Sequence, residues 1–303
     1  MSSPARALPF DARFPIVNAP MGGVAGGALA SAVTRAGGLG MIGQGSAGSV
    51  ASLTAQLALV PEGVRVGIGV VDWVVRRDPA LLELALDADP VLLSVGFGDE
   101  LDWIRRAQDR GILTAVQVFD GQGARAADAA GADVIVVRGR EAGGHGRHLV
   151  DRDALLDETL SVTDRPVLAA GAIATAADVR AALDRGASGV WVGTAFTAAV
   201  EALSSQGSRE ALLAAGPDDT VLTSVFDEAA GWSWPSDIPE RVLANAFTAR
   251  WASGASPEAR AEFAGAAAHD DPRGMSVNAG LGVGHLTEEL PAADVLAALA
   301  AGL

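Results

Sequence analysis

The stretch Val134-Ile-Val-Val-Arg-Gly-Arg-Glu-Ala-Gly-Gly-His-Gly-Arg-His148 decides the fold prediction and points to a site. Its first four residues are β-branched, and such an uninterrupted apolar run is typical of a strand buried on both faces. The run continues into a charged, glycine-rich loop that holds His145, one of only four histidines in the chain. We interpret this loop as backbone that approaches a flat ligand, with one titratable side chain directed at that ligand.

Short apolar runs alternate with helical segments on both sides of this stretch. The expected strands cover residues 15–19, 39–42, 64–71, 91–95, 112–119, 134–137, 166–170 and 189–192. The expected helices cover residues 25–36, 49–60, 78–86, 99–110, 123–130, 153–160, 175–185 and 194–203. Strands that are apolar on both faces indicate a parallel sheet covered by helices. Eight such units favour a (β/α)8 TIM barrel, although strand counting alone leaves an open doubly wound sheet as an alternative.

The pattern changes after residue 203. We therefore expect a barrel over residues 1–203 and a helical appendage over residues 204–303 that covers the barrel mouth. Helices are expected over residues 241–251 and 292–301, and the last of them is expected to return to the barrel. We assign Trp232, Trp234 and Trp251 to the core of the appendage, with stacking on a ligand as the alternative.

Composition excludes several classes of function. The formal net charge is −15, which disfavours nucleic acid and anionic membrane surfaces because both require concentrated positive potential. The chain contains no Cys, no Tyr and no Lys, so a cysteine nucleophile and a Schiff-base lysine are excluded. Neither a signal peptide nor a membrane span is recognisable, and we expect a cytoplasmic protein. A homodimer is an option that the sequence leaves open.

Two glycine-containing loops follow the expected seventh and eighth strands. They are Gly171-Ala-Ile173 and Gly193-Thr194. Unpaired N–H groups at such turns bind phosphate, and barrels commonly hold phosphate in these two loops. One glycine loop alone is explained by a tight turn, but the pair in this order predicts a phosphate site. The segment Pro20-Met-Gly-Gly23 is either a simple strand exit or a backbone edge laid against a flat ring.

His145 is the candidate catalytic residue. Its neighbours are glycines and charged residues, so a packed core position is not expected. A neutral imidazole near pH 7 can take a proton from an acidified carbon or hydrogen-bond an anion. The alternative is an exposed histidine without a function. A metal site would combine His145 with His148 and with Asp151 or Asp153, but loop spacing gives that group no geometric support and no metal is expected.

Several motifs support a family resemblance when they are taken together. In the barrel they are Ala19-Pro-Met-Gly22, Ala36-Gly-Gly-Leu-Gly40, Gly139-Arg-Glu-Ala-Gly-Gly-His145, Ala169-Ala-Gly-Ala-Ile173 and Gly186-Ala-Ser-Gly-Val-Trp-Val-Gly-Thr-Ala-Phe196. In the tail they are Arg241-Val-Leu-Ala-Asn-Ala-Phe247 before Trp251, and Ala279-Gly280 to Gly284. The set resembles the nitronate monooxygenases, formerly called 2-nitropropane dioxygenases, over nearly the whole chain.

The resemblance implies an enzyme, a flavin-dependent monooxygenase with FMN bound in the barrel. The implied reaction is oxidation of alkyl nitronates, extended to neutral nitroalkanes, by O2 to a carbonyl compound and nitrite. Its partners are the small-molecule substrate and O2, and His145 matches the base that removes the α proton. The residues implied to contact FMN are Ala19, Pro20, Met21, Gly22, Gly69, Gln117, Arg138, Gly143, Gly144, Gly171, Ala172, Trp191, Val192, Gly193 and Thr194.

The chain departs from the family pattern at four of the quoted positions. Gly69 stands where an Asn is usual, Arg138 stands where a Gln is common, and Leu281 replaces a Gln. Ala172 replaces a Gly, which is tolerable if φ at that residue is negative. We expect the fixed charge of Arg138 to favour an anionic reduced flavin or to bind an anionic substrate.

Two other readings of the residues stay open. One is an NAD(P)H-dependent FMN reductase of the enoyl-thioester or quinone type, which shares the barrel and a Gly-Gly-His loop. The other is a barrel that binds FMN without turnover, or a structural partner protein, and the intact His145 argues against it.

Overall fold

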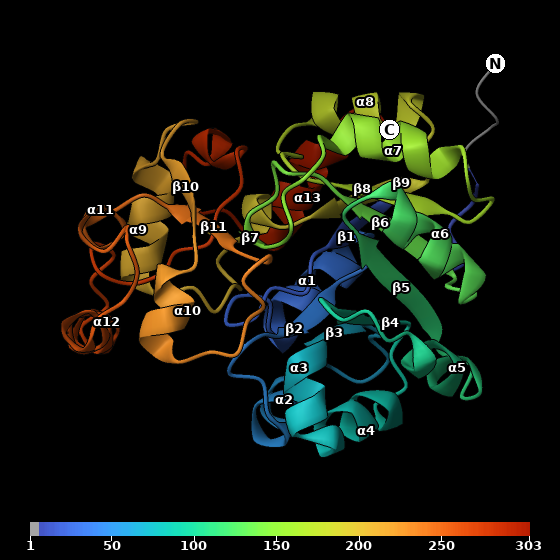
Figure 1. Cartoon of the computed structure of the whole chain (residues 1–303). Coiled ribbons are helices and arrows are strands. Elements are labelled where there is room, and N and C mark those ends of the chain that lie inside the picture. Colours follow the sequence, from blue (N-terminus) through green and yellow to red (C-terminus); the bar gives the residue numbers. More distant parts are fainter. Residues whose placement is uncertain (1–5) are drawn as a thin grey trace.

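Eight parallel strands form one sheet in the computed structural model, which describes residues 6–303. Around the sheet the strands follow the order β1 (Ile16–Asn18), β9 (Gly189–Val192), β8 (Val167–Ala170), β6 (Val134–Arg138), β5 (Leu113–Val118), β4 (Leu92–Gly96), β3 (Gly67–Val71) and β2 (Met41–Gln44). Helices cover the outside of this sheet (Figure 1). The predicted (β/α)8 barrel is confirmed, and the alternative of an open doubly wound sheet is wrong.

The seam between the first and second strands is closed partly by a side chain. Val17 forms a parallel bridge with Leu39, just before β2. Beyond that bridge, the side chain of the fully buried Asn18 makes the hydrogen bonds to β2. Its Oδ1 accepts a hydrogen bond from the Met41 N–H at 2.9 Å, and its Nδ2 donates to the Met41 carbonyl at 3.2 Å. An amide side chain can satisfy both backbone groups because it carries a donor and an acceptor.

Alternation along β6 explains how the barrel core and the site are linked. Val134 and Val136 point into the barrel, where they join the inner cluster, whereas Ile135 and Val137 pack in the layer between the sheet and the helices. Arg138 has the same parity as Val136, so the pleat carries it to the inner side at the carboxyl end of the strand. Leu8 and Phe10 pack against the same inner cluster.

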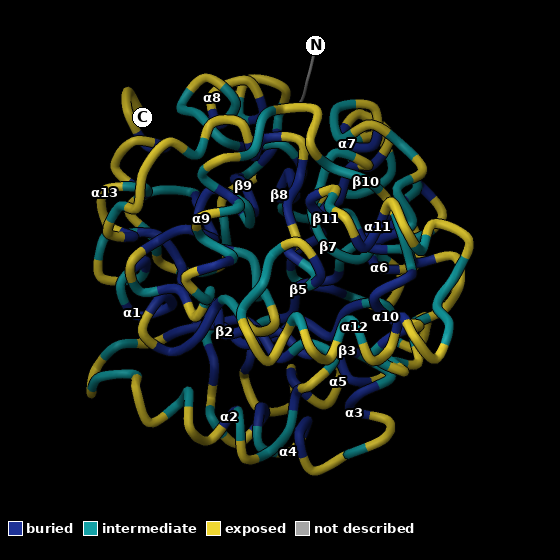
Figure 2. Tube along the Cα trace, turned by 90° about the vertical axis from the view of Figure 1, so that its left-hand side faces the viewer, coloured by how far each residue is buried: buried dark blue, intermediate teal, exposed yellow. Residues whose placement is uncertain are grey.

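Eight α-helices accompany the barrel in the described residues. They are α1 (Gly27–Ala36), α2 (Val50–Leu57), α3 (Asp72–Arg77), α4 (Pro79–Asp87), α5 (Asp102–Gln108), α6 (Gly121–Ala129), α7 (Arg152–Leu160) and α8 (Ala176–Asp184). The expected helix over residues 194–203 is wrong, because only the 3-10 turn η1 (Thr194–Phe196) forms there. Figure 2 shows the buried segments at the centre of the trace and the exposed ones at its rim. None of the helices within residues 6–303 has the length and apolarity needed to cross a membrane.

The last hundred residues contain strands as well as helices. The elements are α9 (Gln206–Ala214), β10 (Thr220–Thr223), α10 (Val225–Ala230), β11 (Glu240–Leu243), α11 (Ala246–Arg250), α12 (Pro257–Ala268), η2 (Val283–His285) and α13 (Ala292–Leu299). The helix expected over 241–251 is wrong in its first part, which pairs as β11 in an antiparallel sheet with β10. The red helix α13 in Figure 1 packs against α1 and α8 of the barrel.

The third strand of that antiparallel sheet comes from the barrel. It is β7 (Gly144–His145), within the glycine-rich loop that follows β6. Glu240 is the Cα partner of His145, and Arg241 is the partner of Gly144. Residues 240–241 of the appendage therefore help to hold the histidine loop in place. This tertiary contact cannot be predicted from the local sequence.

Candidate active site

A cavity of about 520 Å³ opens at the carboxyl ends of the barrel strands. All residues proposed from the sequence to contact a cofactor line it, and so does His145. The set is Ala19, Pro20, Met21, Gly22, Gly69, Gln117, Arg138, Gly143, Gly144, Gly171, Ala172, Trp191, Val192, Gly193 and Thr194. Gly69 also has a packing reason, because a Cβ there would lie 2.3 Å from Pro20 Cγ. The present position of Pro20 therefore excludes the usual Asn.

Backbone donors without acceptors lie in the two glycine loops. Gly171 has a φ of 123°, and Ala172 follows it with a φ of 48°. The condition that φ of Ala172 be negative is therefore not met, and Ala172 holds a left-handed conformation that favours glycine. The N–H groups of Ala172, Gly193 and Thr194 have no hydrogen-bond acceptor among residues 6–303. The three residues are half-buried in the cavity wall, so their unpaired N–H groups are available to an anion bound there.

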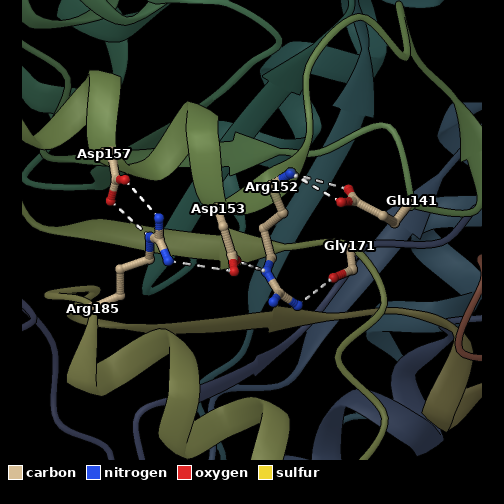
Figure 3. A network of polar contacts seen from close by, with 6 residues as sticks. All are labelled: Glu141, Arg152, Asp153, Asp157, Gly171 and Arg185. Atoms are coloured by element: carbon tan, nitrogen blue, oxygen red, sulfur yellow. Dashed lines mark hydrogen bonds and ion pairs between the residues drawn. The ribbon is translucent and has the colours of Figure 1, made fainter.

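Arg152 ties the histidine loop to the first of these glycine loops (Figure 3). Its guanidinium donates to the Gly171 carbonyl at 2.8 Å, and its backbone N–H donates to the Glu141 carboxylate at 3.1 Å. The same guanidinium pairs with Asp153, which also faces Arg185. Turning the Gly171 carbonyl toward Arg152 fixes that peptide plane, and the plane sets where the Ala172 N–H points.

The tail signature, residues 279–284, contacts the histidine loop and the glycine loop that follows β9. The Gly280 N–H donates to Thr194 Oγ1 at 2.9 Å, and the Leu281 N–H donates to the Glu141 carbonyl at 2.9 Å. Leu281 thus contacts the histidine loop through its backbone, a bond that does not depend on the side chain. A Cβ on Gly143 would lie 2.5 Å from the backbone of Gly280, so both chains approach closely here.

His145 is fixed on one edge and on one face. Its Nε2 lies 2.9 Å and 3.1 Å from the two carboxylate oxygens of Asp227, in α10. The indole of Trp234 stacks on the imidazole with 3.6 Å between ring centroids and 7° between planes. Trp234 Nε1 in turn donates to Ser46 Oγ at 2.9 Å, beyond the end of β2. The imidazole therefore has a defined orientation in the cavity.

Burial dominates the electrostatics around His145. It lowers the pKa of His145 to about 4; the Glu240 charge opposes this shift and the Arg138 charge adds to it. Burial also raises the pKa of Asp227 to about 7, with a smaller contribution from Glu228. Burial likewise raises the pKa of Glu240 to about 7. Desolvation disfavours the charged form of each group, so the imidazole is neutral at pH 7 and can accept a proton.

Arg138 is the permanent charge in the cavity wall. Its Nη2 donates to the Gly143 carbonyl at 2.6 Å, its guanidinium carbon lies 5.8 Å from the centre of the Phe119 ring, and Nη1 has no partner in residues 6–303. Gly146 makes room for it, because a Cβ there would lie 1.7 Å from Nη1. Burial, followed by the charge of Arg241, lowers the pKa of Arg138 to about 9, which still leaves it charged at pH 7.

Three parts of the site escaped prediction from the sequence. Trp232 and Trp234 line the cavity, so their assignment to the appendage core is wrong, whereas Trp251 does pack against Phe247 in that core. The hydroxyl of Ser94 is buried in the wall without a partner among the described residues. Asp227 and Glu240 had no local signal, since neither lies in a glycine-rich loop. The only signal in the sequence for these residues was the pair Trp232 and Trp234, separated by one serine.

One group within residues 6–303 has the spacing of metal ligands, and it shares only His145 with the group considered from the sequence. Ligand atoms of His145, Asp227 and Glu240 lie within 4.8 Å of one another. Hydrogen bonds already account for the arrangement. Glu240 Oε2 accepts from Ser276 Oγ at 3.1 Å and from Asn278 Nδ2 at 2.8 Å, while Asp227 faces His145. The positive Arg138 nearby also opposes a further cation.

Comparison with known proteins places this site in a family. A family model described as nitronate monooxygenase matches residues 50–302. A nitronate monooxygenase of Paraburkholderia phytofirmans is 33% identical, with 80% of this chain and 77% of that protein covered. The solved nitroalkane oxidase from Streptomyces ansochromogenes superposes with a TM-score of 0.80 at 29% identity, covering 96% of this chain and 95% of the other. FabK from Thermotoga maritima gives 0.79 at 25% identity, with coverage of 95% and 92%.

Proposed function

Since the chain belongs to the nitronate monooxygenase family, we propose that it oxidises alkyl nitronates with FMN as cofactor and O2 as oxidant. The products would be a carbonyl compound and nitrite, and neutral nitroalkanes would be used after loss of the α proton. One observation carries the proposal. A single cavity presents unpaired N–H groups at Ala172, Gly193 and Thr194 and, elsewhere in its wall, the neutral imidazole of His145.

The residues around the cavity fit a flavin mononucleotide. Three N–H groups without acceptors suit a phosphate, which binds to such donors. The hydroxyl of Ser94 and the amide of Gln117 lie in the same wall and offer polar atoms to a ring edge. The backbone from Ala19 to Gly22 supplies a further edge. Bound there, the flavin would take electrons from the substrate and pass them to O2, chemistry that side chains do not supply.

His145 would accept the α proton of a neutral nitroalkane. In a neutral nitroalkane the α C–H bond must break, and a neutral imidazole can accept that proton. The stacked Trp234 covers one face of the ring, which restricts the approach of water from that side. A preformed nitronate has already lost the α proton and needs no base. The base is therefore required only for the neutral substrate.

The reductase reading keeps one specific observation in its favour. FabK from Thermotoga maritima superposes nearly as well as the nitroalkane oxidase. An enzyme of that kind would take its electrons from NAD(P)H and would pass them to an unsaturated substrate instead of to O2. The cavity is compatible with either electron donor. The two functions are therefore distinguished by whether a nitronate or NAD(P)H reduces the flavin.

The deciding experiment is an anaerobic titration of the purified protein followed by its absorption spectrum. We expect a flavin spectrum that bleaches on addition of the nitronate of 2-nitropropane and returns when O2 is admitted, with release of nitrite. NADPH alone should leave the spectrum unchanged. Bleaching by NADPH and none by the nitronate would establish the reductase instead. A protein that neither contains nor binds FMN would overturn both functions.

A further inference from the structure

Asp227 depends on one hydrogen-bond donor. Its side chain is 8% exposed, and among residues 6–303 the only hydrogen-bond partner of its carboxyl group is His145 Nε2. A buried carboxylate without a donor is costly, so the pair is a defined interaction and not an incidental contact. The two residues come from different parts of the chain, because Asp227 lies in α10 and His145 in β7.

The other ring nitrogen of His145 is free. Nδ1 has no hydrogen-bond partner in the described part of the chain, and the ring lines the cavity. Trp234 holds the face of the ring, and the backbone pairing of β7 with β11 holds its Cα. Only Nδ1 is therefore left without a protein partner.

We propose that Asp227 is a positioning residue that keeps the proton of His145 on Nε2 and thereby makes Nδ1 the basic atom. A carboxylate can only accept, so the ring nitrogen that faces it must donate. A neutral imidazole has one N–H, and its other nitrogen then carries the lone pair. The proposal rests on the proposed function, because it assigns the atom that would take the α proton in that reaction.

The step balances as a proton transfer. The α C–H bond of the nitroalkane breaks and its electron pair stays with the substrate as the nitronate. The proton forms a bond to Nδ1, so His145 becomes an imidazolium while the substrate becomes an anion. The Asp227 carboxylate, 2.9 Å from Nε2, then faces a positive ring and stabilises it.

Charged groups on three elements set the pH range in which this arrangement holds. Glu240 in β11 and Arg138 in β6 act on His145 with opposite signs, and Glu228 in α10 acts on Asp227. Burial and the Glu228 charge raise the pKa of Asp227 to about 7. Below that pH the carboxyl group takes a proton and donates it toward Nε2. The ring proton must then sit on Nδ1, and the base is blocked.

The direct test is nitrogen NMR of the holoenzyme with ¹⁵N-labelled histidine. The chain has only four histidines, and His145→Asn assigns the signal of His145 by its loss. Above pH 7 we expect the His145 signal to report a proton on Nε2 and none on Nδ1. A proton on Nδ1 above pH 7 would overturn the proposal. This readout needs no turnover, so its outcome is independent of whether nitronates are the substrate.

The kinetic test compares Asp227→Asn with Asp227→Glu in the same holoenzyme. For Asp227→Asn, loss of the carboxylate should lower kcat on a neutral nitroalkane by about 10²–10⁴-fold, with a far smaller change on the preformed nitronate. Asp227→Glu should restore part of the loss. In the wild type, kcat on the nitroalkane should rise with pH through about 7, and this rise should be lost in Asp227→Asn.

Glu228→Gln is the matched control, since it removes a charge from the first turn of the same helix without contacting His145. It should leave both activities within about twofold of the wild type and move the pH midpoint only downward. Equal losses of nitroalkane and nitronate turnover in Asp227→Asn would overturn the positioning role. Absence of nitronate turnover in the wild type would instead refute the proposed function while leaving the NMR result standing.

Discussion

The two ends of the cavity are built in different ways. The end that we propose binds phosphate, called the phosphate end below, consists of the backbone of Ala172, Gly193 and Thr194, in loops that directly follow β8 and β9. The end that we propose handles the proton, called the proton end below, consists of the side chains of His145, Asp227 and Glu240, in β7, α10 and β11. One end is a local consequence of turn geometry, whereas the other exists only when the appendage pairs with the barrel loop. Substitutions at the first end should therefore weaken FMN binding, and substitutions at the second should alter proton transfer.

The largest effect is expected at the proton end. His145→Asn removes the base, so oxidation of a neutral nitroalkane should fall by about 10²–10⁴-fold while oxidation of the preformed nitronate falls far less. Steady-state rates with both forms of one substrate give this ratio. The exposed His285 provides the control, because His285→Asn should leave both rates near those of the wild type. An equal loss for both substrates would remove the base role from His145.

A change at the phosphate end should act on cofactor binding. Gly171→Ala places a Cβ at a φ of 123°, a strain of about 1–3 kcal/mol that the loop must relieve by moving. We expect the FMN dissociation constant to rise by about tenfold or more, measured by fluorescence titration of the apoprotein.

Gly131→Ala is the matched control for that strain. Gly131 has a φ of 80°, nothing lies within 4 Å of an added Cβ, and the residue follows α6 away from the cavity. It should lower the melting temperature without changing FMN affinity. If both variants bind FMN as tightly as the wild type, the Gly171 loop is not a phosphate site.

Arg138 lines the same cavity and should have an intermediate effect. Arg138→Gln removes the fixed charge from the wall, so binding of an anionic substrate should weaken by about tenfold, or the flavin potential should fall. The KM for a nitronate and the midpoint potential of the bound flavin measure these outcomes. Because the charge acts on an anion, the KM for a neutral nitroalkane should change less. If neither the nitronate KM nor the potential shifts, the charge has no role in the site.

The smallest effect is expected at Ala172, whose φ is 48°. Ala172→Gly relieves the strain of the left-handed conformation but raises the conformational entropy of the unfolded chain. A net stabilisation of at most about 1 kcal/mol is therefore expected. A thermal melt of the FMN-bound protein measures it. Ala174→Gly, two residues on and without positive φ, should instead destabilise by about 0.4–1 kcal/mol, because glycine gives the unfolded chain more conformational freedom. Destabilisation of similar size in both would show that residue 172 is not strained.

Prediction from the sequence succeeded where the signal was local. The β-branched run at residues 134–137 and the glycines after β8 and β9 predicted the barrel and the residues gathered at its mouth. It failed where a pattern had two readings. Residues 241–243 were read as helix, yet they pair with β10, and Trp232 and Trp234 were read as core, yet they face the cavity. Apolar periodicity identifies a side chain that avoids water but does not say which surface it packs against.

The sequence by itself determined the eight strands, seven of the helices that follow them, the paired glycine loops and the loop that holds His145, because each depends on residues close along the chain. The tertiary structure alone decided which groups control that histidine. Asp227 lies 82 residues from His145 in sequence but 2.9 Å away in space, brought there by α10 beside an antiparallel sheet that shares the histidine loop. A carboxylate carries no local sign of its future partner, so this contact becomes visible only when the chain is folded.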